Sequence, residues 1–539
     1  MSTATNITAK LWEMANRLRG TMDASEYKNY ILPFMFYRYL SENQAQYLQD
    51  NHLEEFYEVT DEEEKEEYLQ DISTTLGYAI DPDFSWQVIV DKIENHQIKA
   101  SDFQDLFESF SLNAKRNPGA ADDFANVFSD INLGNTRLGG STNERAKTLN
   151  DIVLMINDFS FTDESGKDVL GAVYEYLIGQ FAATAGKKGG EFYTPHEVSQ
   201  VLAKLVSAEQ VEREGQFRVY DPTMGSGSLL LTVQDELPNG DEKGAVHFYG
   251  QELNTTTYNL ARMNLMMHHV NYRNMDLKRG DTLGPDWPFT EKDGTQVPEK
   301  FDAVVANPPY SQKWDIKGVD RNKDIRFKNF GVAPASKADY AFVLHGLYHL
   351  ESAGTMAIVL PHGVLFRGAS EGRIRKNIIQ ENLLDAVIGL PANLFYGTSI
   401  PTCILVFKGH DARQARKDVL FIDASSEFEK GKNQNTLSAA NIDKIIQTYR
   451  DRKDVDKYAH VATLDEIEEN DYNLNIPRYV DTFEEEPEIP LSEVATELEQ
   501  VQTEIDASTQ ELFSLLQDLE GTTDESKAEL KKFIEILGK

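Results

Sequence analysis

The sequence predicts an α/β protein with a mostly parallel, doubly wound sheet, an N-terminal helical domain and a C-terminal helical tail. Near the N-terminus, apolar residues such as Leu11, Met14 and Leu18 recur at helical spacing. From Leu491 onward, apolar residues alternate three and four positions apart, as in a coiled-coil seam. In between, helical stretches alternate with short apolar segments, which is typical of a parallel sheet covered by helices on both faces. These expected strands are 217–221, 247–252, 301–306, 355–360, 384–390, 403–407 and 419–423.

The length of 539 residues exceeds what one hydrophobic core usually supports, so several domains are expected. The patterns suggest four segments. They are an N-terminal helical domain at 1–165, the α/β domain at 166–425, a mixed connecting region at 426–485, and heptad helices for partner docking at 486–539. Gly521 and the Thr-x-x-Glu pattern at Thr522 predict a helix stop followed by a capping box.

Composition limits the partners and the compartment. The formal net charge is −36, so a phosphate backbone would be repelled unless basic residues cluster locally. The single cysteine, Cys403, excludes a disulfide within the chain and fits a reducing cytoplasm. No apolar run approaches the roughly 18 residues that a membrane span requires, so no membrane association is expected.

A glycine-rich turn follows the first expected strand, with the sequence DPTMGSGS from Asp221 to Ser228. Gly225 and Gly227 allow a tight turn and close approach of a ligand to the backbone, and the next helix offers free N–H groups. The turn matches neither the phosphate-binding GxxxxGK[ST] pattern nor the dinucleotide GxGxxG pattern. It therefore predicts a nucleotide-like ligand of another class.

Two acidic residues end neighbouring strands. Glu252 closes the strand HFYGQE and could accept hydrogen bonds from both hydroxyls of a ribose. Asp281 follows another short strand and could bind the amine of an adenine ring. Taken alone, each could equally be an ordinary acidic strand end.

The most informative motif is Asn307-Pro308-Pro309-Tyr310, directly after the apolar strand FDAVVA. The prolines lack N–H donors and stiffen the turn, so the Asn307 side-chain oxygen and the Pro308 carbonyl can both accept from one –NH2 group. Tyr310 offers a flat face for a planar base. Because this turn follows a glycine-rich loop and a ribose-type glutamate, the combination indicates that an amino group is held beside a nucleotide-like ligand.

With these motifs the chain resembles amino-group DNA methyltransferases, and in particular the modification (HsdM) subunit of type I restriction–modification systems. The resemblance covers about residues 8 to 410 and implies a Rossmann-like methyltransferase sheet. Besides the motifs above, it rests on LWEMANRLRG, EYKNYILPFMFYRYLS, VYEYLIGQFA, GGEFYTPHEV, ADYAFVLHGL, LFRGASEGRIRK and LPANLFYGTSIPTCILVF.

The resemblance also implies roles for individual residues. S-adenosyl-L-methionine would be the cofactor, and Asn307 to Tyr310 would hold the target adenine, with Phe395 against the flipped base. Met224 stands where the family usually has a small residue; a bulkier side chain there could crowd the glycine-rich loop, but the Met side chain is adaptable. The residues expected to bind the cofactor are Glu191, Phe192, Tyr193, Thr194, Pro195, His196, Asp221, Thr223, Met224, Gly225, Ser226, Gly227, Glu252 and Asp281.

The expected reaction is direct transfer of a methyl group to N6 of an adenine flipped out of double-stranded DNA. It requires no metal, and the sequence contains no HExxH or CxxC pattern. Basic stretches at 311–337 and around Arg373 could meet the DNA backbone or be ordinary surface loops.

No target-recognition, helicase or nuclease segment is evident, so the resemblance implies three partners. They are a specificity (HsdS-like) subunit, a restriction (HsdR-like) subunit and a second copy of the chain. Two alternatives stay open at this point. One is a methyltransferase acting on glutamine amides of proteins, and the other is a non-catalytic scaffold that keeps the fold.

Overall fold

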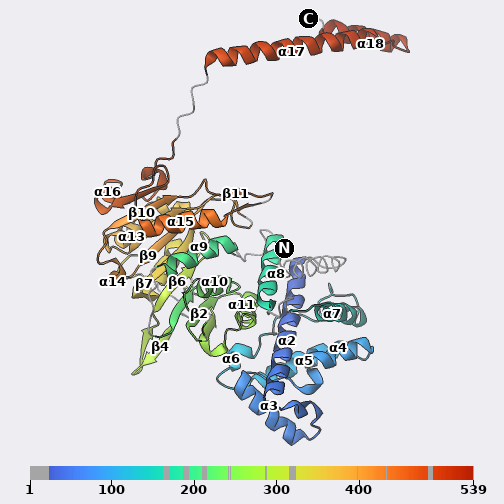
Figure 1. The fold of residues 1–539 in the computed structure, drawn as a ribbon, viewed down its shortest axis with the longest axis vertical. Helices are drawn as coiled ribbons and strands as arrows, with labels where there is room; N and C mark the ends of the chain where they lie inside the picture. Colours follow the sequence, from blue (N-terminus) through green and yellow to red (C-terminus); the bar gives the residue numbers. More distant parts are fainter. Residues whose placement is uncertain are drawn as a thin grey trace. The chain divides into compact units, whose positions relative to one another are not determined.

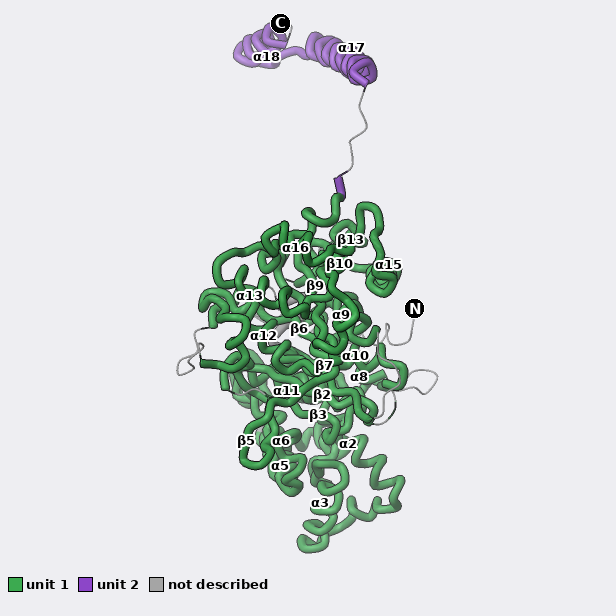
Figure 2. Tube along the Cα trace, turned by 90° about the vertical axis from the view of Figure 1, so that its left-hand side faces the viewer, with its two compact units in different colours: residues 1–481 green, residues 482–539 purple. Residues whose placement is uncertain are grey.

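The chain forms two compact units, residues 1–481 and residues 482–539, which Figure 2 distinguishes by colour. The computed structural model describes residues 24–161, 169–185, 194–208, 215–240, 242, 244–285, 288–314, 323–396, 398–432, 434–483 and 490–537. None of the described helices is both long enough and apolar enough to cross a membrane.

Among the described residues, a nine-stranded sheet runs through the first unit in the order β13-β10-β8-β9-β7-β6-β1-β2-β3 (Figure 1). Most neighbouring strands are parallel, while β9 is antiparallel to β7 and β8, and β13 is antiparallel to β10. The strands are β1 (Phe217–Asp221), β2 (Val246–Glu252), β3 (Met275–Arg279), β6 (Phe301–Ala306), β7 (Leu350–Pro361), β8 (Leu384–Gly389), β9 (Thr402–Lys408), β10 (Asp418–Asp423) and β13 (Ala459–Thr463).

The predicted fold class is confirmed, and each of the seven expected strands is present. The chain runs from β1 outward through β2 to β3, and then returns to place β6 on the other side of β1. Because the strand order reverses between β1 and β6, the carboxyl ends of these two strands border the crevice where such sheets bind ligands. Two small hairpins lie outside the sheet, β4 (Phe289–Lys292) with β5 (Thr295–Pro298), and β11 (Glu429–Lys430) with β12 (Asn435–Thr436).

Helices cover both faces of the sheet, because its strands are apolar on both sides. Buried side chains of one face form a core with α9, α10, α11 and α15, and those of the other face pack with α12 and α13. The helices are α9 (His196–Ser207), α10 (Ser228–Asp235), α11 (Thr255–Met267), α12 (Asp339–His349), α13 (Ala369–Gln380), α14 (His410–Arg413) and α15 (Ala439–Asp451).

The N-terminal part of the first unit is helical, as expected. Its long helix α2 packs against α7, α8 and α11, so its core is continuous with one face of the sheet. The buried guanidinium of Arg262 on α11 donates to the carbonyls of Asp122 and Asp123, at 2.9 and 2.8 Å. The helices are α2 (Ala24–Asp50), α3 (Glu62–Leu76), α4 (Trp86–Glu94), α5 (Ala100–Ala114), α6 (Ala121–Phe124), α7 (Thr142–Asn157) and α8 (Leu170–Ala185).

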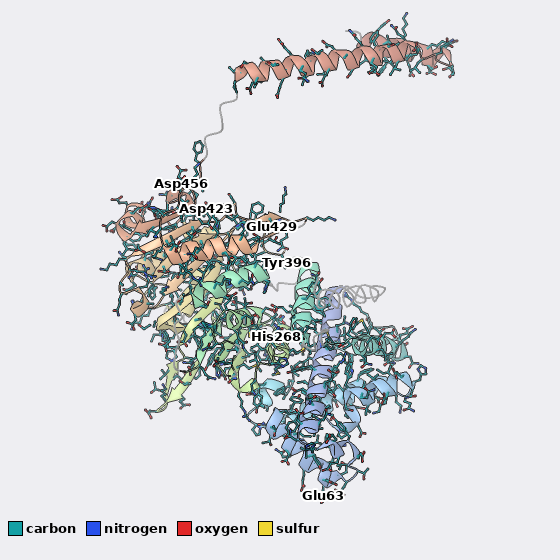
Figure 3. All side chains as sticks on the ribbon, viewed as in Figure 1. Glu63, His268, Tyr396, Asp423, Glu429 and Asp456 are labelled. Carbon is teal, nitrogen blue, oxygen red and sulfur yellow. The ribbon has the colours of Figure 1, made fainter. Side chains whose placement is uncertain are left out.

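The acidic run DEEEKEE lies at the start of α3. Asp61 caps the helix by accepting from the N–H groups of Glu63 and Glu64. These carboxylates stabilise the positive end of the helix dipole. Glu63 lies at the outer tip of the helical part in Figure 3, and the run forms a solvated helix face.

Residues 426–483, whose role the sequence left open, complete one edge of the sheet. Strand β13 pairs with β10, and α15 packs against both α9 and β10. The short helix α16 (Leu464–Glu469) packs on β13, and the ring of Tyr479 stacks on that of Phe421 in β10 at a centroid distance of 3.8 Å. This segment is therefore part of the same folded body as the motifs.

The second unit consists of α17 (Leu491–Gln517) and α18 (Asp524–Leu537), joined by a short turn. The turn around Gly521 lies where the sequence predicted it, but the predicted capping box at Thr522 and Glu525 is wrong. Instead, Thr523 and Ser526 cap α18, because the backbone N–H of each residue donates a hydrogen bond to the side-chain hydroxyl oxygen of the other.

Candidate functional site at the carboxyl ends of the strands

Asp221 ends β1 and is almost completely buried, with 2% of its surface exposed. Its carboxylate accepts hydrogen bonds from the N–H of Thr223 at 2.8 Å and from its hydroxyl at 3.4 Å. Burial raises the pKa of Asp221 to about 7, and the negative charge of Glu252 also raises it. A cationic ligand would favour the ionised form.

The two glycines of the turn serve different purposes. Both have positive φ, +54° at Gly225 and +78° at Gly227. A side chain at Gly227 would collide with Leu265 on α11, whereas a Cβ at Gly225 would meet nothing within 4 Å. Gly227 is thus required by packing, and Gly225 leaves the backbone exposed to open space at the expected ligand position.

Met224 does not crowd the glycine-rich loop, although its side chain is larger than the small residue usual in the family. Its side chain is buried, and a Cβ on residue 250 would clash with its sulfur. Gly250 in β2 therefore provides the space for Met224. The backbone N–H of Met224 donates to the carbonyl of Gln251 at 3.0 Å, which joins the turn to β2.

Glu252 and Asp281 lie at the ends of adjacent strands. Glu252 ends β2, and its carboxylate accepts from the N–H of Asn254 at 2.8 Å. Its carbonyl accepts from the N–H of Gly280 at 3.0 Å, and Asp281 follows directly. The Asp281 carboxylate accepts from the N–H of Leu283 at 3.0 Å. Three acidic residues thus follow one another across the ends of β1, β2 and β3.

Asn307 follows β6 directly and is buried. Its amide N–H donates to the hydroxyl of Thr194 at 3.0 Å, and its side-chain oxygen accepts from the hydroxyl of Tyr310 at 2.8 Å. Thr194 thereby fixes the orientation of the amide, with the oxygen on the Tyr310 side. That oxygen has a second lone pair, with which it can accept from a substrate amine.

Phe395 is buried beside Tyr310. The two rings meet edge to face, with centroids 6.1 Å apart and planes at 82°. The structure therefore brings together Thr194, Asn307, Tyr310 and Phe395 from segments that are far apart in the sequence. Pro195 is buried at the start of α9, and His196, its first residue, is exposed. Glu191, Phe192 and Tyr193 lie outside the described residues.

Comparison with known proteins identifies the family of the chain. The N-6 DNA Methylase family matches residues 165–488, and the HsdM N-terminal domain family matches residues 7–156. The type I restriction enzyme MpnII methylase subunit of Mycoplasma pneumoniae is 37% identical over 500 residues, which are 89% of this chain and 90% of that protein. The HindI methylase subunit of Haemophilus influenzae is 31% identical over 408 residues, 72% of this chain and 84% of that one.

A crystal structure of a type I restriction–modification methyltransferase subunit from Streptococcus thermophilus is similar over 89% of this chain and 100% of its own. The sequence identity is 43%, and the TM-score is 0.79. The chain belongs to the N-6 DNA methylase family. It is the modification subunit of a type I restriction–modification system, an adenine-specific DNA methyltransferase, as the motifs predicted.

The family assignment decides between the alternatives that the sequence left open. A glutamine-specific protein methyltransferase would share the Asn-Pro-Pro-Tyr turn, but an HsdM N-terminal domain precedes the N-6 DNA methylase domain here. A non-catalytic scaffold is disfavoured because Asn307 and Glu252 both lie at strand ends of the expected crevice.

Sequence reasoning missed Asp339 as a site residue of this N-6 DNA methylase. Ser311, next to the Asn-Pro-Pro-Tyr turn, has a left-handed φ of +53°, a strained conformation for a residue other than glycine. The buried Asp339 carboxylate accepts from the N–H of Ser311 at 2.7 Å, and Arg367 donates to the same carboxylate at 2.7 Å. The only signal in the sequence was an acidic residue at the start of an apolar helical stretch.

The two basic stretches are only partly available to DNA. Arg326, Arg367 and Arg375 all direct hydrogen bonds to groups of the protein itself. Among the described basic residues of these stretches, Lys313, Lys323, Lys328, Arg373 and Lys376 are exposed. The count of basic residues therefore overstated the positive surface near the turn.

Proposed function

We propose that residues at the ends of β1, β2 and β3 bind S-adenosyl-L-methionine, and that the turn after β6 holds a flipped adenine beside it. The observation that carries this proposal is the adjacency of β1 and β6. It places the end of β1, at Asp221, beside the start of the Asn307 turn, at the switch point of the sheet.

The residues fit the cofactor by their chemistry. Gly225 faces open space, and Asp221, Glu252 and Asp281 supply acceptors for a cation, a ribose and an adenine amine. Leu253, which the sequence did not suggest, is 62% exposed beside Glu252 and could cover an apolar ring face. When bound, this cofactor supplies an electrophilic methyl group on a positively charged sulfur.

The protein's contribution to the transfer is orientation and charge stabilisation. The Asn307 side-chain oxygen and the Pro308 carbonyl accept from the two N–H bonds of the adenine amine. This directs the nitrogen lone pair at the methyl group and stabilises the positive charge that develops on the nitrogen. Thr194 keeps the Asn307 amide in the accepting orientation. Tyr310 and Phe395 form the apolar wall against the base.

Extruding the adenine from the duplex costs a few kcal/mol of stacking and pairing. A chain of net charge −36 offers few compensating phosphate contacts. We therefore assign much of the DNA affinity to other subunits, a specificity subunit and, in the full system, a restriction subunit. One structural relative is described in a study of the assembly of a type I system, and its similarity to this chain has a TM-score of 0.62 at 19% identity.

The second unit is the proposed docking element for the specificity subunit. The heptad seam of α17 is exposed along its length, with Leu498 at 70%, for example. Ser508 interrupts the seam, which disfavours a long self-paired coil. Two copies of the chain per complex, the four-segment domain division and a cytoplasmic location are predictions of the same proposal.

Labelled S-adenosyl-L-methionine tests the proposal. Duplex DNA and a glutamine-containing peptide are offered as acceptors to the chain alone and to the chain with its specificity subunit. We expect label in DNA only, and only with the specificity subunit present. Equal labelling by the lone chain, or label in the peptide, would contradict it.

A further inference from the structure

A buried arginine holds the loop that follows the third acidic residue of the site. Arg326 is 3% exposed, and its guanidinium donates to the carbonyls of Thr282, Leu283 and Gly284 at 2.8, 3.0 and 3.0 Å. These are the three residues directly after Asp281. The planar guanidinium is suited to this task because it presents several fixed donors at once.

The same guanidinium begins a chain of buried hydrogen bonds. The Arg326 guanidinium lies 3.0 Å from Nδ1 of His345. On the other side of the ring, Nε2 of His345 lies 2.8 Å from the Tyr220 hydroxyl. That hydroxyl lies 3.1 Å from the side-chain oxygen of Gln251. An arginine can only donate, so Nδ1 accepts and the proton of the neutral ring is on Nε2. His345 then donates to Tyr220, and Tyr220 donates to Gln251.

The donor and acceptor roles along this series of hydrogen bonds do not change at neutral pH. Burial lowers the pKa of His345 well below its usual range, and the neighbouring His349 and Arg326 lower it further. The imidazole therefore stays neutral, with one acceptor and one donor nitrogen. Because each link has a defined donor and acceptor, the network favours one arrangement of the elements that it joins.

Three residues of the network, Tyr220, Gln251 and Thr282, are each adjacent to one of the three acidic residues. Tyr220 precedes Asp221, Gln251 precedes Glu252, and Thr282 follows Asp281. The Thr282 hydroxyl also donates to the carbonyl of Pro222 at 2.5 Å, which joins the third loop to the first. Neighbouring residues in a strand point to opposite sides, so the network can lie beneath the strand ends without filling the ligand space.

We propose that Arg326, His345 and Tyr220 are positioning residues that fix the spacing of the three strand ends around the cofactor. This inference deepens the proposed function and rests on the cofactor site assigned there. Arg326 follows the Asn-Pro-Pro-Tyr turn in the chain, so the segment after the target turn also shapes the cofactor site.

The test compares two tyrosines that each lose one buried hydroxyl. In Tyr220→Phe the link from His345 to Gln251 is broken. In the control Tyr340→Phe, a buried hydroxyl loses its bond of 2.9 Å to the carbonyl of Val364, away from the network. The full chain is used, and S-adenosyl-L-methionine binding is measured by calorimetry alongside the melting temperature.

We expect Tyr220→Phe to weaken cofactor binding by about threefold to tenfold, the usual effect of one hydrogen bond, while Tyr340→Phe binds like the wild type. Arg326→Lys should weaken binding by about tenfold or more, because an ammonium with three N–H donors cannot serve the three carbonyls, His345 and Asp324 at once. In the complex with the specificity subunit and at saturating cofactor, methyl transfer by Tyr220→Phe should stay within about twofold of the wild type, since the network sets affinity and not chemistry.

Equal cofactor affinities of Tyr220→Phe and Tyr340→Phe would overturn the inference, and so would a Tyr220→Phe defect that persists at saturating cofactor. Glu252→Ala serves as the reference. If Glu252→Ala weakens binding and Tyr220→Phe does not, only the network fails. If neither weakens binding, the cofactor site itself is misassigned and the network has no part in it.

Discussion

The strand ends of the first unit bury polar side chains, whereas the seam of α17 exposes apolar ones. At the strand ends, polar groups such as Asp221 and Asn307 are buried and hydrogen-bonded by their neighbours. Along α17, leucines such as Leu498 and Leu515 are exposed, at 70% and 60%. Burying polar groups and exposing apolar side chains both lower the stability of the fold. Such groups are therefore expected mainly where a function needs them. The first pattern indicates a site completed within the chain, and the second indicates a surface completed by a partner.

The largest expected effect is at Asn307. Asn307→Ala should lower methyl transfer by about a thousandfold or more, because the acceptor at the target amine is lost, while cofactor binding changes by less than about twofold. Transfer rates in the assembled complex and calorimetry with S-adenosyl-L-methionine measure the two effects. Thr194→Ala removes only the hydrogen bond that orients the Asn307 side-chain amide, so it should retain more activity than Asn307→Ala. Near-normal turnover of Asn307→Ala would remove the turn from the catalytic site.

Removing the second unit should abolish assembly and leave the site intact. Each seam leucine that a partner buries should contribute roughly 1.5–3 kcal/mol. Deleting residues 486–539 should therefore leave a chain that binds the cofactor but does not co-purify with its specificity subunit.

Single substitutions on α17 sharpen that experiment. Leu498→Glu places a charge on the exposed seam, and Gln500→Glu places the same charge two residues on, away from the seam. Only Leu498→Glu should reduce co-purification. Full assembly of both the truncated chain and Leu498→Glu would mean that α17 packs only within its own unit.

Glu252 should have an intermediate effect, confined to the cofactor. Glu252→Ala should weaken S-adenosyl-L-methionine binding by about 1.5–3 kcal/mol, the usual contribution of charge-assisted hydrogen bonds. Calorimetry measures this directly. An unchanged dissociation constant would exclude Glu252 from the ribose site.

The smallest expected effect is a pH dependence set by Asp221. Burial raises its pKa to about 7, so the carboxyl is mostly neutral at pH 6 and mostly ionised at pH 8. A positively charged cofactor prefers the ionised form, so its affinity should rise with pH by about threefold to tenfold over this range. Asp221→Asn should flatten that profile, and a wild-type profile that is flat or falls with pH would contradict the assignment.

Much of the fold was predictable because its signals are local. The apolar strands, the glycine-rich turn and the Asn-Pro-Pro-Tyr turn each lie within a few consecutive residues. The pairing of β13 with β10 was not predictable from local signals, because it depends on contacts across the sheet. The capping of α18 by Thr523 was misplaced by one residue, since Thr522 offers the same chemistry next to it.

Within the site, the groups that touch a ligand were easier to predict than the groups that support them. Gly225, Glu252 and Asn307 belong to local sequence motifs. By contrast, Asp339 bonds to a residue 28 positions away in the sequence, and Arg326 bonds to residues about 40 positions away. Arg326 was counted as a base for DNA, yet its donors point inward to carbonyls. Charge counts cannot distinguish these cases, because they carry no information on direction.

The most direct test of the central claim is methylation-sensitive sequencing of a host that carries this gene with its specificity subunit. We expect N6-methyladenine at one defined DNA sequence with the natural gene, and none at that sequence when the gene encodes Asn307→Ala. Equal methylation with Asn307→Ala, or modification of a base other than adenine, would contradict it.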